Sequence, residues 1–334
     1  MKIERPEILK MLRNAEDYVS GQEICDRYNV SRTAVWKYIN QLRDEGYNVE
    51  AVQNKGYRLL EGGVPDILNE EEISSRLTTK WAARQLKYLP ETGSTNADAA
   101  RMADEGAHHG LLVTAGTQKA GRGRRGRIWQ SPEGTTISMS IALKPDFAPD
   151  YASMLTLVSA HSTCMALEKI TGEEIGIKWP NDLVIGGKKI CGILTEMNAQ
   201  IDYIKHVVIG TGINVNQEDV SYFPEEIRET ATSLRIATGR KWNRALIIAE
   251  SMNCFERDYD LFTKTLDLSG ILDDYNAHLV NKDRAVRVLD PKGEYNGTAK
   301  GINEKGELAV TDEDGELHYV FAGEVSVRGI YGYV

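Results

Sequence analysis

The chain has 334 residues, of which 41% are hydrophobic and 27% charged, and its formal net charge is −9. This length predicts more than one domain, and the composition excludes a disordered or fibrous protein. The negative charge excludes a protein whose whole surface binds nucleic acid. Charges in the first residues, MKIERPEILK, argue against a signal peptide, and no stretch approaches the ~18 apolar residues of a membrane helix. We therefore expect a cytoplasmic protein that does not contact a membrane.

The four cysteines are scattered along the chain, at Cys25, Cys164, Cys191 and Cys254. None belongs to a C-x-x-C pair, and none has a histidine nearby at ligand spacing. This pattern is typical of buried thiols in a reducing compartment and predicts neither a disulfide framework nor a metal site.

The first sixty residues hold ten Lys/Arg and nine Asp/Glu, a net charge of +1, so the remainder carries −10. Within them, Ser20–Tyr47 shows two short amphipathic helical patterns on either side of a turn at 28–30, which is the outline of a helix-turn-helix. In the second pattern Val35, Ile39 and Leu42 form one core-facing stripe, and Ser31 stands where an N-cap hydroxyl is needed.

The opposite face of this second helix carries side chains that can reach bases and phosphates in a major groove. The candidate DNA-binding residues are Ser31, Arg32, Thr33, Trp36 and Lys37. Two short alternating strands follow, joined by a turn at Asn54–Gly56, and a helix-turn-helix with such a hairpin resembles a winged helix. The alternative is a small helical domain with a solvated face; the hairpin favours DNA binding.

The stretch EGGVPD, residues 61–66, has the Gly-Gly and Pro of a linker, and the character of the chain changes after it. We predict three domains: a DNA-binding domain at 1–63, a catalytic domain at 64–282 and a small domain at 283–334.

The middle segment mixes strands and helices. Apolar strands are expected at 110–116, 135–143 and 207–215, around a helical pattern at 153–170. Two further strands straddle Gly186-Gly187, a two-residue loop that favours an antiparallel hairpin. We therefore expect an α+β domain with a mostly antiparallel sheet and helices on it.

The segment GTQKAGRGRRGRIWQSPEG, residues 116–134, fits the dinucleotide fingerprint G-x-G-x-x-G through Gly121, Gly123 and Gly126. That fingerprint requires a helix directly after the glycines, whereas RIWQSPEG cannot easily begin one. A dinucleotide loop is therefore not expected.

The same loop concentrates bidentate donors for phosphate or carboxylate at Arg122, Arg124, Arg125 and Arg127. A solvated basic loop or a nonspecific nucleic-acid arm is the alternative. Flanking strands and Trp129, a planar surface on which a base can stack, favour a loop that wraps an anionic ligand.

A second unusual stretch is IKWPNDLVIGGKKICGILTE, where Lys178 and Lys189 stand next to apolar runs. Surface strands also carry lysines, so this alternative stays open, with more weight at Lys178 than at Lys189.

Five ordered motifs together resemble the biotin–protein ligase family: ETGSTN, GTQKAGRGRRGRIWQSP, KWPNDL, KKICGIL and IGTGINVN. The helix-turn-helix ahead of them is similar to that of the bifunctional members, which also repress biotin-synthesis genes. The resemblance covers essentially the whole chain. It implies a class II synthetase-like ligase domain between the winged helix and an SH3-like terminal domain.

The resemblance also assigns the site residues. It implies a pocket for biotin and biotinyl-5′-AMP made by Ser94, Thr95, Asn96, Gln118, Arg122, Gly123, Arg124 and Lys189. Of these, Lys189 and Arg124 are the candidate catalytic residues, with Lys189 at the biotin carboxylate and the activated phosphate. Trp129, Asn181, Asp182 and Asn214 are expected on the nucleotide side.

The reaction that the resemblance implies has two steps. Biotin and ATP, with Mg²⁺ on the substrate phosphates, give biotinyl-5′-AMP and pyrophosphate. A lysine of a biotin carboxyl carrier protein domain then attacks the adenylate. Fixed cations offset the repulsion between carboxylate and phosphate, and a glycine-hinged loop can close over the adenylate to exclude water. The repressor function implies operator DNA and a homodimer promoted by biotinyl-5′-AMP.

From Arg284 onward short apolar runs alternate with turns at Pro291–Gly293, Glu304–Gly306 and Glu313–Gly315, which predicts a small β-barrel. Two other functions remain open for the whole chain. One is a ligand-sensing transcription factor without catalysis, and the other is a lipoate-type acyl ligase. The arginine loop and KWPNDL favour the biotin ligase.

Overall fold

The computed structural model describes residues 5–60, 65–290, 293–321, 326–329 and 333. The chain forms two compact units, the first comprising Met1–Leu77 and Asn243–Ala249 and the second Thr78–Trp242 and Glu250–Val334. Residues 61–64 of the predicted linker lie outside the described residues, as do Pro291 and Lys292 of a predicted turn. The boundaries at 63 and 282 stay predictions.

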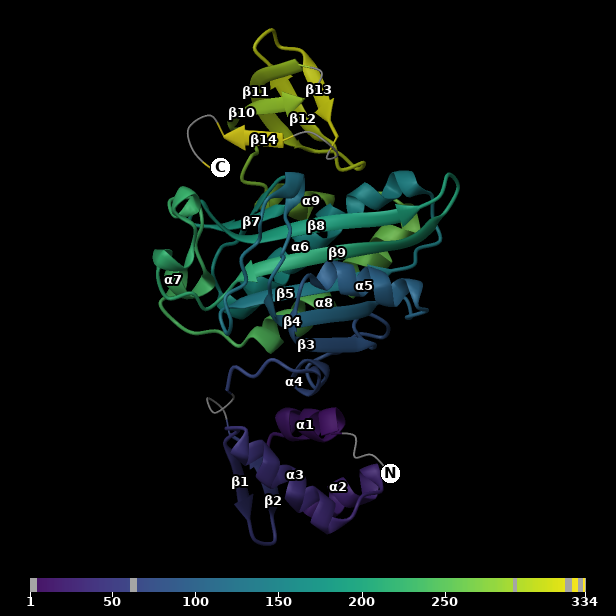
Figure 1. Cartoon of the computed structure of the whole chain (residues 1–334), viewed down its shortest axis with the longest axis vertical. Helices are drawn as coiled ribbons and strands as arrows, with labels where there is room; N and C mark the ends of the chain where they lie inside the picture. The colour runs from purple at the N-terminus through teal and green to yellow at the C-terminus, as the bar shows by residue number, and fades with distance from the viewer. Residues whose placement is uncertain (1–4, 61–64, 291–292, 322–325, 330–332, 334) are drawn as a thin grey trace. The chain divides into compact units, whose positions relative to one another are not determined.

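The first unit contains the predicted winged helix (Figure 1). Its elements are α1 (Arg5–Asn14), α2 (Gly21–Tyr28), α3 (Arg32–Asp44), the antiparallel pair β1 (Val49–Val52) and β2 (Gly56–Leu59), and α4 (Glu70–Ser74). The hydroxyls of Ser20 and Ser31 cap α2 and α3, because they accept from Glu23 N and Ala34 N at 3.0 and 3.2 Å. Both caps fix where a helix of the motif begins.

The core of this unit confirms the predicted stripe on α3. Val35, Ile39 and Leu42 are buried and pack with α1 residues Ile8 and Leu12. A close approach also explains one glycine. Gly56 has a φ of +124°, and a Cβ there would lie 2.0 Å from the backbone oxygen of Val19, so the β1–β2 hairpin packs here only with glycine.

A buried carboxylate joins α4 to the winged helix. The Glu72 side chain is fully buried and binds Arg13 Nη2 at 2.9 Å and Arg76 Nη2 at 2.6 Å. The hydroxyl of Tyr47 donates to its Oε2 at 2.5 Å. Burial and this carboxylate raise the pKa of Tyr47, so its hydroxyl remains a donor. Glu72 therefore connects α1, the α3–β1 turn and α4.

A second buried pair joins residues 243–249 to the same unit. Arg244 Nε lies 3.0 Å from Asp66 Oδ2, with both side chains less than 10% exposed. The Arg244 backbone N–H also donates to Asp66 Oδ1 at 2.9 Å, and Asn243 Nδ2 donates to Pro65 O at 3.0 Å. The residues that begin α8 (Arg244–Thr265) are thus part of the first unit, and the rest of α8 is part of the second.

The second unit is built on a seven-stranded sheet in the order β3-β4-β5-β9-β8-β7-β6 (Figure 1). The strands are β3 (Leu86–Thr92), β4 (Leu111–Gln118), β5 (Thr136–Leu143), β6 (Gly176–Lys178), β7 (Asp182–Ile185), β8 (Lys188–Ala199) and β9 (Ile204–Asn214). Only β3 and β4 pair in parallel among them. The predictions of a mostly antiparallel sheet and of a hairpin around Gly186-Gly187 are confirmed.

Helices and 3-10 turns surround this sheet. They are α5 (Thr95–Asp104), α6 (Leu155–Thr171), α7 (Leu234–Thr238), α8, α9 (Leu272–His278), and the turns η1 (Arg124–Gly126), η2 (Pro149–Met154), η3 (Val220–Tyr222) and η4 (Glu225–Ile227). Helix α5 packs against β4, β5 and β9, and α6 packs against β6 to β9. Every residue of β5 is buried, so both faces of the sheet centre are covered.

The chain continues into a five-stranded antiparallel sheet in the order β13-β12-β11-β10-β14. Its strands are β10 (Ala285–Asp290), β11 (Gly293–Ile302), β12 (Leu308–Asp312), β13 (Leu317–Val320) and β14 (Ser326–Gly329). Asn276 of α9 exchanges two hydrogen bonds with the backbone of Ile302, and Trp179 Nε1 donates to Gly306 O at 3.1 Å. These contacts bind the small sheet to the larger one.

No helix within the described ranges combines the length and the apolar character needed to cross a bilayer.

Candidate functional site

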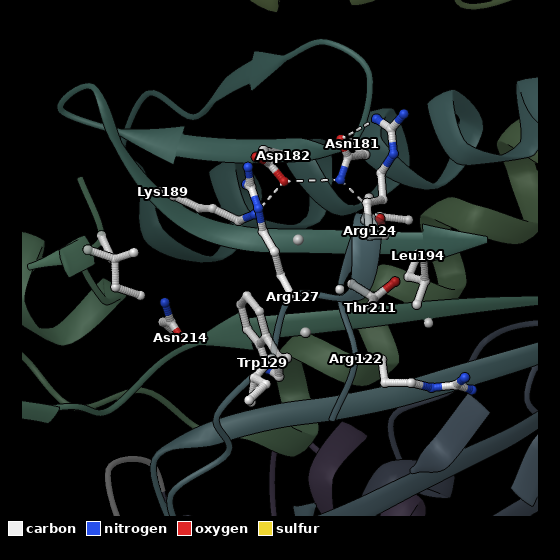
Figure 2. A pocket seen from close by; sticks show the side chains of 18 of the residues that line it. Arg122, Arg124, Arg127, Trp129, Asn181, Asp182, Lys189, Leu194, Thr211 and Asn214 are labelled. Atoms are coloured by element: carbon white, nitrogen blue, oxygen red, sulfur yellow. Dashed lines mark hydrogen bonds and ion pairs between the residues drawn. The ribbon is translucent and has the colours of Figure 1, made fainter. Parts of the chain in front are cut away.

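A cavity of about 970 Å³ in the second unit contains the predicted site residues (Figure 2). Its lining includes the start of α5, the ends of β4 and β9, the 122–130 loop, β7, β8, Val327–Gly329 and Tyr333. The size is that of a site for a drug-sized ligand. All the site residues predicted on the ligase body line it: Ser94, Thr95, Asn96, Gln118, Arg122, Gly123, Arg124, Trp129, Asn181, Asp182, Lys189 and Asn214.

One end of the cavity is lined by hydroxyl and amide groups. Gln118 Oε1 accepts from the backbone N–H and the hydroxyl of Thr95, at 2.8 and 3.0 Å. Ser140 bridges Thr95 and Asn96, at 2.7 and 2.6 Å. Ser94 occupies the N-cap position of α5, but its hydroxyl makes no capping bond. This end therefore offers fixed donors and acceptors to an uncharged polar ligand group.

Three glycines on β8 and β9 form the floor of the cavity. A Cβ on Gly212 would lie 2.5 Å from the indole of Trp129, and one on Gly210 would lie 2.1 Å from Asn96 Oδ1. A Cβ on Gly192 would meet Lys189 Nζ at 3.1 Å. The strands lack side chains at these positions because the side chains of Trp129, Asn96 and Lys189 occupy that space.

The arginine loop forms an arch and no α-helix. Gly123 N donates to Arg127 O at 2.7 Å and Trp129 N donates to Gly121 O at 2.9 Å, with the short turn η1 between them. Arg125 has a φ of +58°, in the left-handed region. The interpretation that the match to a dinucleotide fingerprint is accidental agrees with this geometry, because no helix N-terminus follows Gly126.

Cations gather at the other end of the cavity around one carboxylate. Lys189 Nζ lies 2.5 Å from Asp182 Oδ1, and Asn181 Nδ2 donates to the same oxygen at 3.2 Å. Arg124 Nη1 donates to Asn181 Oδ1 at 3.0 Å. Burial lowers the pKa of Arg124, although its guanidinium stays charged at neutral pH. Figure 2 shows these side chains grouped together, whereas Arg122 points away from them and pairs with Glu196 at 3.3 Å.

Two nucleotide-side candidates have distinct surroundings. Asn214 donates to Thr232 O at 3.1 Å and accepts from Gln217 at 3.2 Å. Both the nitrogen and the oxygen of its side-chain amide are therefore hydrogen-bonded within the protein. Trp129 lies under Lys189, whose Nζ is 5.9 Å from the ring centroid. The Trp129 Nε1 atom is buried and, among the described residues, has no hydrogen-bond partner.

Lys178 and Tyr333 also line the cavity, and neither was assigned to the site from sequence. Lys178 of β6 is only 7% exposed, and burial lowers its pKa to about 8. Tyr333 places its ring 3.4 Å from Lys178 Nζ and donates its hydroxyl to Asp182 Oδ2 at 2.6 Å. One indication for Lys178 was present in the sequence, because this lysine stands beside an apolar run. Nothing in the sequence indicated that Tyr333 belongs to the cavity.

The cavity carboxylates do not form a site for a resident Mg²⁺ ion. Among the described residues that line the cavity, the carboxylates belong to Asp182 and Glu226. Both oxygens of Asp182 already accept hydrogen bonds, and Glu226 is exposed. An oxygen cage made by the protein alone is therefore not formed by these residues.

The predicted DNA-binding residues lie together on the first two turns of α3. Ser31, Arg32, Thr33, Trp36 and Lys37 are all exposed, and Trp36 is 57% exposed despite its size. Arg32 donates to Gln22 Oε1 of α2 at 2.7 and 3.1 Å. This exposed basic and aromatic face matches the surface that a recognition helix presents to DNA.

Fold and site together define an α+β protein with a cation-lined ligand cavity and a winged helix of the DNA-binding type. The Biotin/lipoate A/B protein ligase family model matches residues 88–214, an HTH domain model matches 5–58, and a Biotin protein ligase C terminal domain model matches 283–328. The chain belongs to the biotin–protein ligase family, in its branch of bifunctional ligase/repressor proteins.

Individual relatives match over nearly their full lengths. The chain is 41% identical to the Bifunctional ligase/repressor BirA of Bacillus subtilis, over 97% of this chain and 98% of that protein. It is 29% identical to the protein of the same name from Escherichia coli, over 96% of each. The solved biotin protein ligase from Aquifex aeolicus in complex with biotin and ATP matches with a TM-score of 0.65 and 30% identity, over 74% of this chain and 99% of that one.

Proposed function

We propose that this protein joins biotin to ATP in the described cavity, transfers biotin from biotinyl-5′-AMP to a carrier-domain lysine, and represses biotin-synthesis genes through its winged helix. The observation that supports the ligase most directly is the two-ended cavity. One end carries neutral amides and hydroxyls, and the other carries Lys189 and Arg124 around a single carboxylate.

The neutral end suits the ureido group of biotin, which has both donor and acceptor edges. Thr95 and Gln118 are already oriented by each other, so they need no rearrangement to present their remaining groups. Apolar Met139, Ile193 and Leu194 line the cavity alongside them, where a hydrocarbon chain can lie.

The cationic end suits the chemistry of adenylation. The biotin carboxylate attacks the α-phosphorus of ATP, the new C–O–P anhydride forms, and the bond to pyrophosphate breaks. Lys189 and Arg124 lower the barrier by attracting the carboxylate and the phosphate oxygens toward one point. Mg²⁺ arrives on the ATP phosphates, since both oxygens of Asp182 already accept hydrogen bonds. ATP as a substrate also accords with a cytoplasmic location.

The test of this function uses the purified full chain with ATP, Mg²⁺ and either biotin or lipoate. We expect pyrophosphate release with biotin, followed by biotin transfer to a carrier domain. Release with lipoate alone would identify a lipoate-type ligase. Biotin binding without pyrophosphate would identify a sensor without catalysis.

Arg124→Gly is expected to release biotinyl-5′-AMP into solution before transfer. Arg124 bonds Asn181 across the cavity, so its loss opens one side of the arginine loop while Lys189 remains in place. Adenylate in the filtrate after rapid ultrafiltration measures the leak. Lys119→Gly removes an exposed cation at the start of the same loop and should retain adenylate as the wild type does. Equal retention by both variants contradicts the proposed role.

The repressor function requires that a ligand change DNA affinity, and this happens only if the ligand favours one state of the protein. We propose that biotinyl-5′-AMP favours a homodimer, which presents two copies of α3 to a two-fold operator. The adenylate accumulates when no acceptor remains, so it reports that biotin demand is met. Sedimentation and operator titration with and without biotin plus ATP test this; unchanged affinity and mass would refute it.

Arg32→Ala and Lys37→Ala are each expected to weaken operator binding by about tenfold at fixed salt, the effect of one lost base or phosphate contact. Both side chains are exposed on α3, and neither lines the ligand cavity. Fluorescence anisotropy with labelled operator measures the loss, and carrier biotinylation should be unchanged. Lys282→Ala removes the same charge from the second unit and should bind DNA normally; if it weakens binding equally, the α3 face is not the DNA contact.

A further inference from the structure

Tyr333 makes two different contacts inside the ligand cavity. Its hydroxyl donates to Asp182 Oδ2 at 2.6 Å, across 151 positions of sequence, and its ring faces Lys178 Nζ at 3.4 Å. Burial raises the pKa of Tyr333, so the hydroxyl keeps its proton and remains a donor. Neither contact belongs to the packing of the small sheet, so the position serves the cavity.

Lys178 depends on this ring. Among the described residues its ammonium group donates no hydrogen bond and forms no ion pair, although the charge of Asp182 acts on it from a longer distance. The Tyr333 ring is therefore its direct counterpart, and a desolvated contact of this kind is worth about 2 kcal/mol. Such an ammonium is held in place yet keeps all three N–H donors for an incoming anion.

Asp182 depends on the hydroxyl. Its Oδ1 accepts from Lys189 and Asn181, and its Oδ2 accepts from Tyr333. Three donors therefore fix the carboxylate plane, and that plane fixes where Lys189 lies. Removing the Tyr333 hydroxyl would free Oδ2, and the carboxylate could then turn toward Lys178.

We propose that Tyr333 is a positioning residue of the adenylation site, which holds Lys178 as a second phosphate-binding cation with its ring and orients Lys189 through Asp182 with its hydroxyl. On ATP binding, the Lys178 ammonium leaves the ring face for a phosphate oxygen, while Lys189 remains directed at the reacting carboxylate. This inference rests on the proposed ligase function and names a residue pair that the function does not otherwise require.

The first test separates the two contacts by substitution. Tyr333→Phe keeps the ring and removes the hydroxyl, whereas Tyr333→Leu removes both. We expect Tyr333→Phe to lower kcat for adenylate formation by about tenfold, the loss of one hydrogen bond to a charged group, with KM for ATP nearly unchanged. Tyr333→Leu should in addition raise KM for ATP. Tyr319→Phe, at an exposed tyrosine of β13, is the control and should behave as the wild type.

The second test does not depend on activity. In protein labelled with ¹³C-lysine, the Lys178 Cε resonance, assigned with Lys178→Arg, should show the ring-current shift of a group over an aromatic face. It should keep that shift in Tyr333→Phe and lose it in Tyr333→Leu. These spectra also show whether each variant is folded.

A pH profile adds a signature that a structural role would not produce. Burial holds the pKa of Lys178 near 8, with Asp182 raising it and Lys189, Arg328 and Arg127 lowering it. The cation is therefore fully present only well below pH 8 and is lost as the pH rises through that value, so kcat/KM for ATP should fall there. Tyr333→Leu admits water, which raises the pKa of Lys178 and moves this alkaline limb upward.

Two results for Tyr333→Leu would contradict the proposed role of Tyr333. Wild-type kinetics and spectra in Tyr333→Leu would overturn the proposal, and so would a lower KM for ATP, which would mean that Tyr333 competes with the nucleotide. If the wild type forms no adenylate from biotin, the proposed function fails by itself. The inference is then judged by the Lys178 resonance and by ATP binding alone, with weaker binding in Tyr333→Leu in its favour and equal binding against it.

Discussion

Lys189→Ala is expected to slow biotinyl-5′-AMP formation by about 10²-fold, the effect of losing one electrostatic contact to a transition state. Lys189 lies 2.5 Å from Asp182 and is only partly exposed, so its charge acts in a poorly solvated place. Its removal also takes from Asp182 its ion-pair partner, which leaves more negative charge beside the incoming carboxylate and phosphate. Single-turnover formation of adenylate from saturating biotin and ATP measures the chemical step directly.

Lys188→Ala is the matched control, because the neighbouring lysine on β8 is exposed and lies outside the cavity. It should form adenylate at the wild-type rate. Lys189→Arg should recover part of the lost rate, since the charge returns with a different shape. A Lys189→Ala enzyme with normal single-turnover kinetics would show that this lysine only binds substrate or supports the fold.

Glu72→Ala is expected to destabilise the first unit by about 3–5 kcal/mol, the usual effect of breaking a buried ion pair from one side. The substitution leaves Arg13 and Arg76 partly buried without their shared carboxylate and removes the acceptor of the Tyr47 hydroxyl. Hydrogen exchange of the α1 and α3 amides should accelerate, and operator binding should be lost. Adenylate formation in the second unit should persist.

Glu16→Ala is the control for Glu72, since Glu16 is exposed between α1 and α2. Glu72→Gln should fall between the two, because it keeps hydrogen-bonding atoms but loses the charge. If Glu72→Ala exchanges its amides as slowly as Glu16→Ala, the buried network does not stabilise the unit.

Local patterns predicted much of the fold. The period of Val35, Ile39 and Leu42 placed the core face of α3, and Gly186-Gly187 placed the β7–β8 hairpin, because each signal involves residues close in sequence. The cavity residues were predicted through ordered motifs, and the structure brings them together, although their roles remain proposals.

Contacts between distant segments left no such signal. Tyr333 reaches Asp182 across 151 positions, and nothing in its neighbours' spacing indicates that. Asp66 and Arg244 form a buried pair, yet each alone reads as an ordinary surface charge. Lys178 was noticed but not assigned, because its meaning depends on the burial and on the ring that the fold supplies.

The split membership of α8 bears on how such a regulator can evolve. A DNA-binding unit that includes residues 243–249 is not a cassette that recombination can exchange at a single junction. Deleting the first stretch of that unit, through Leu77, would remove Asp66 and leave Arg244 without its counter-charge. A deletion that removes the winged helix and keeps this pair must therefore end before Asp66. The first unit is thus less separable from the rest of the chain than the order of the motifs along the sequence implies.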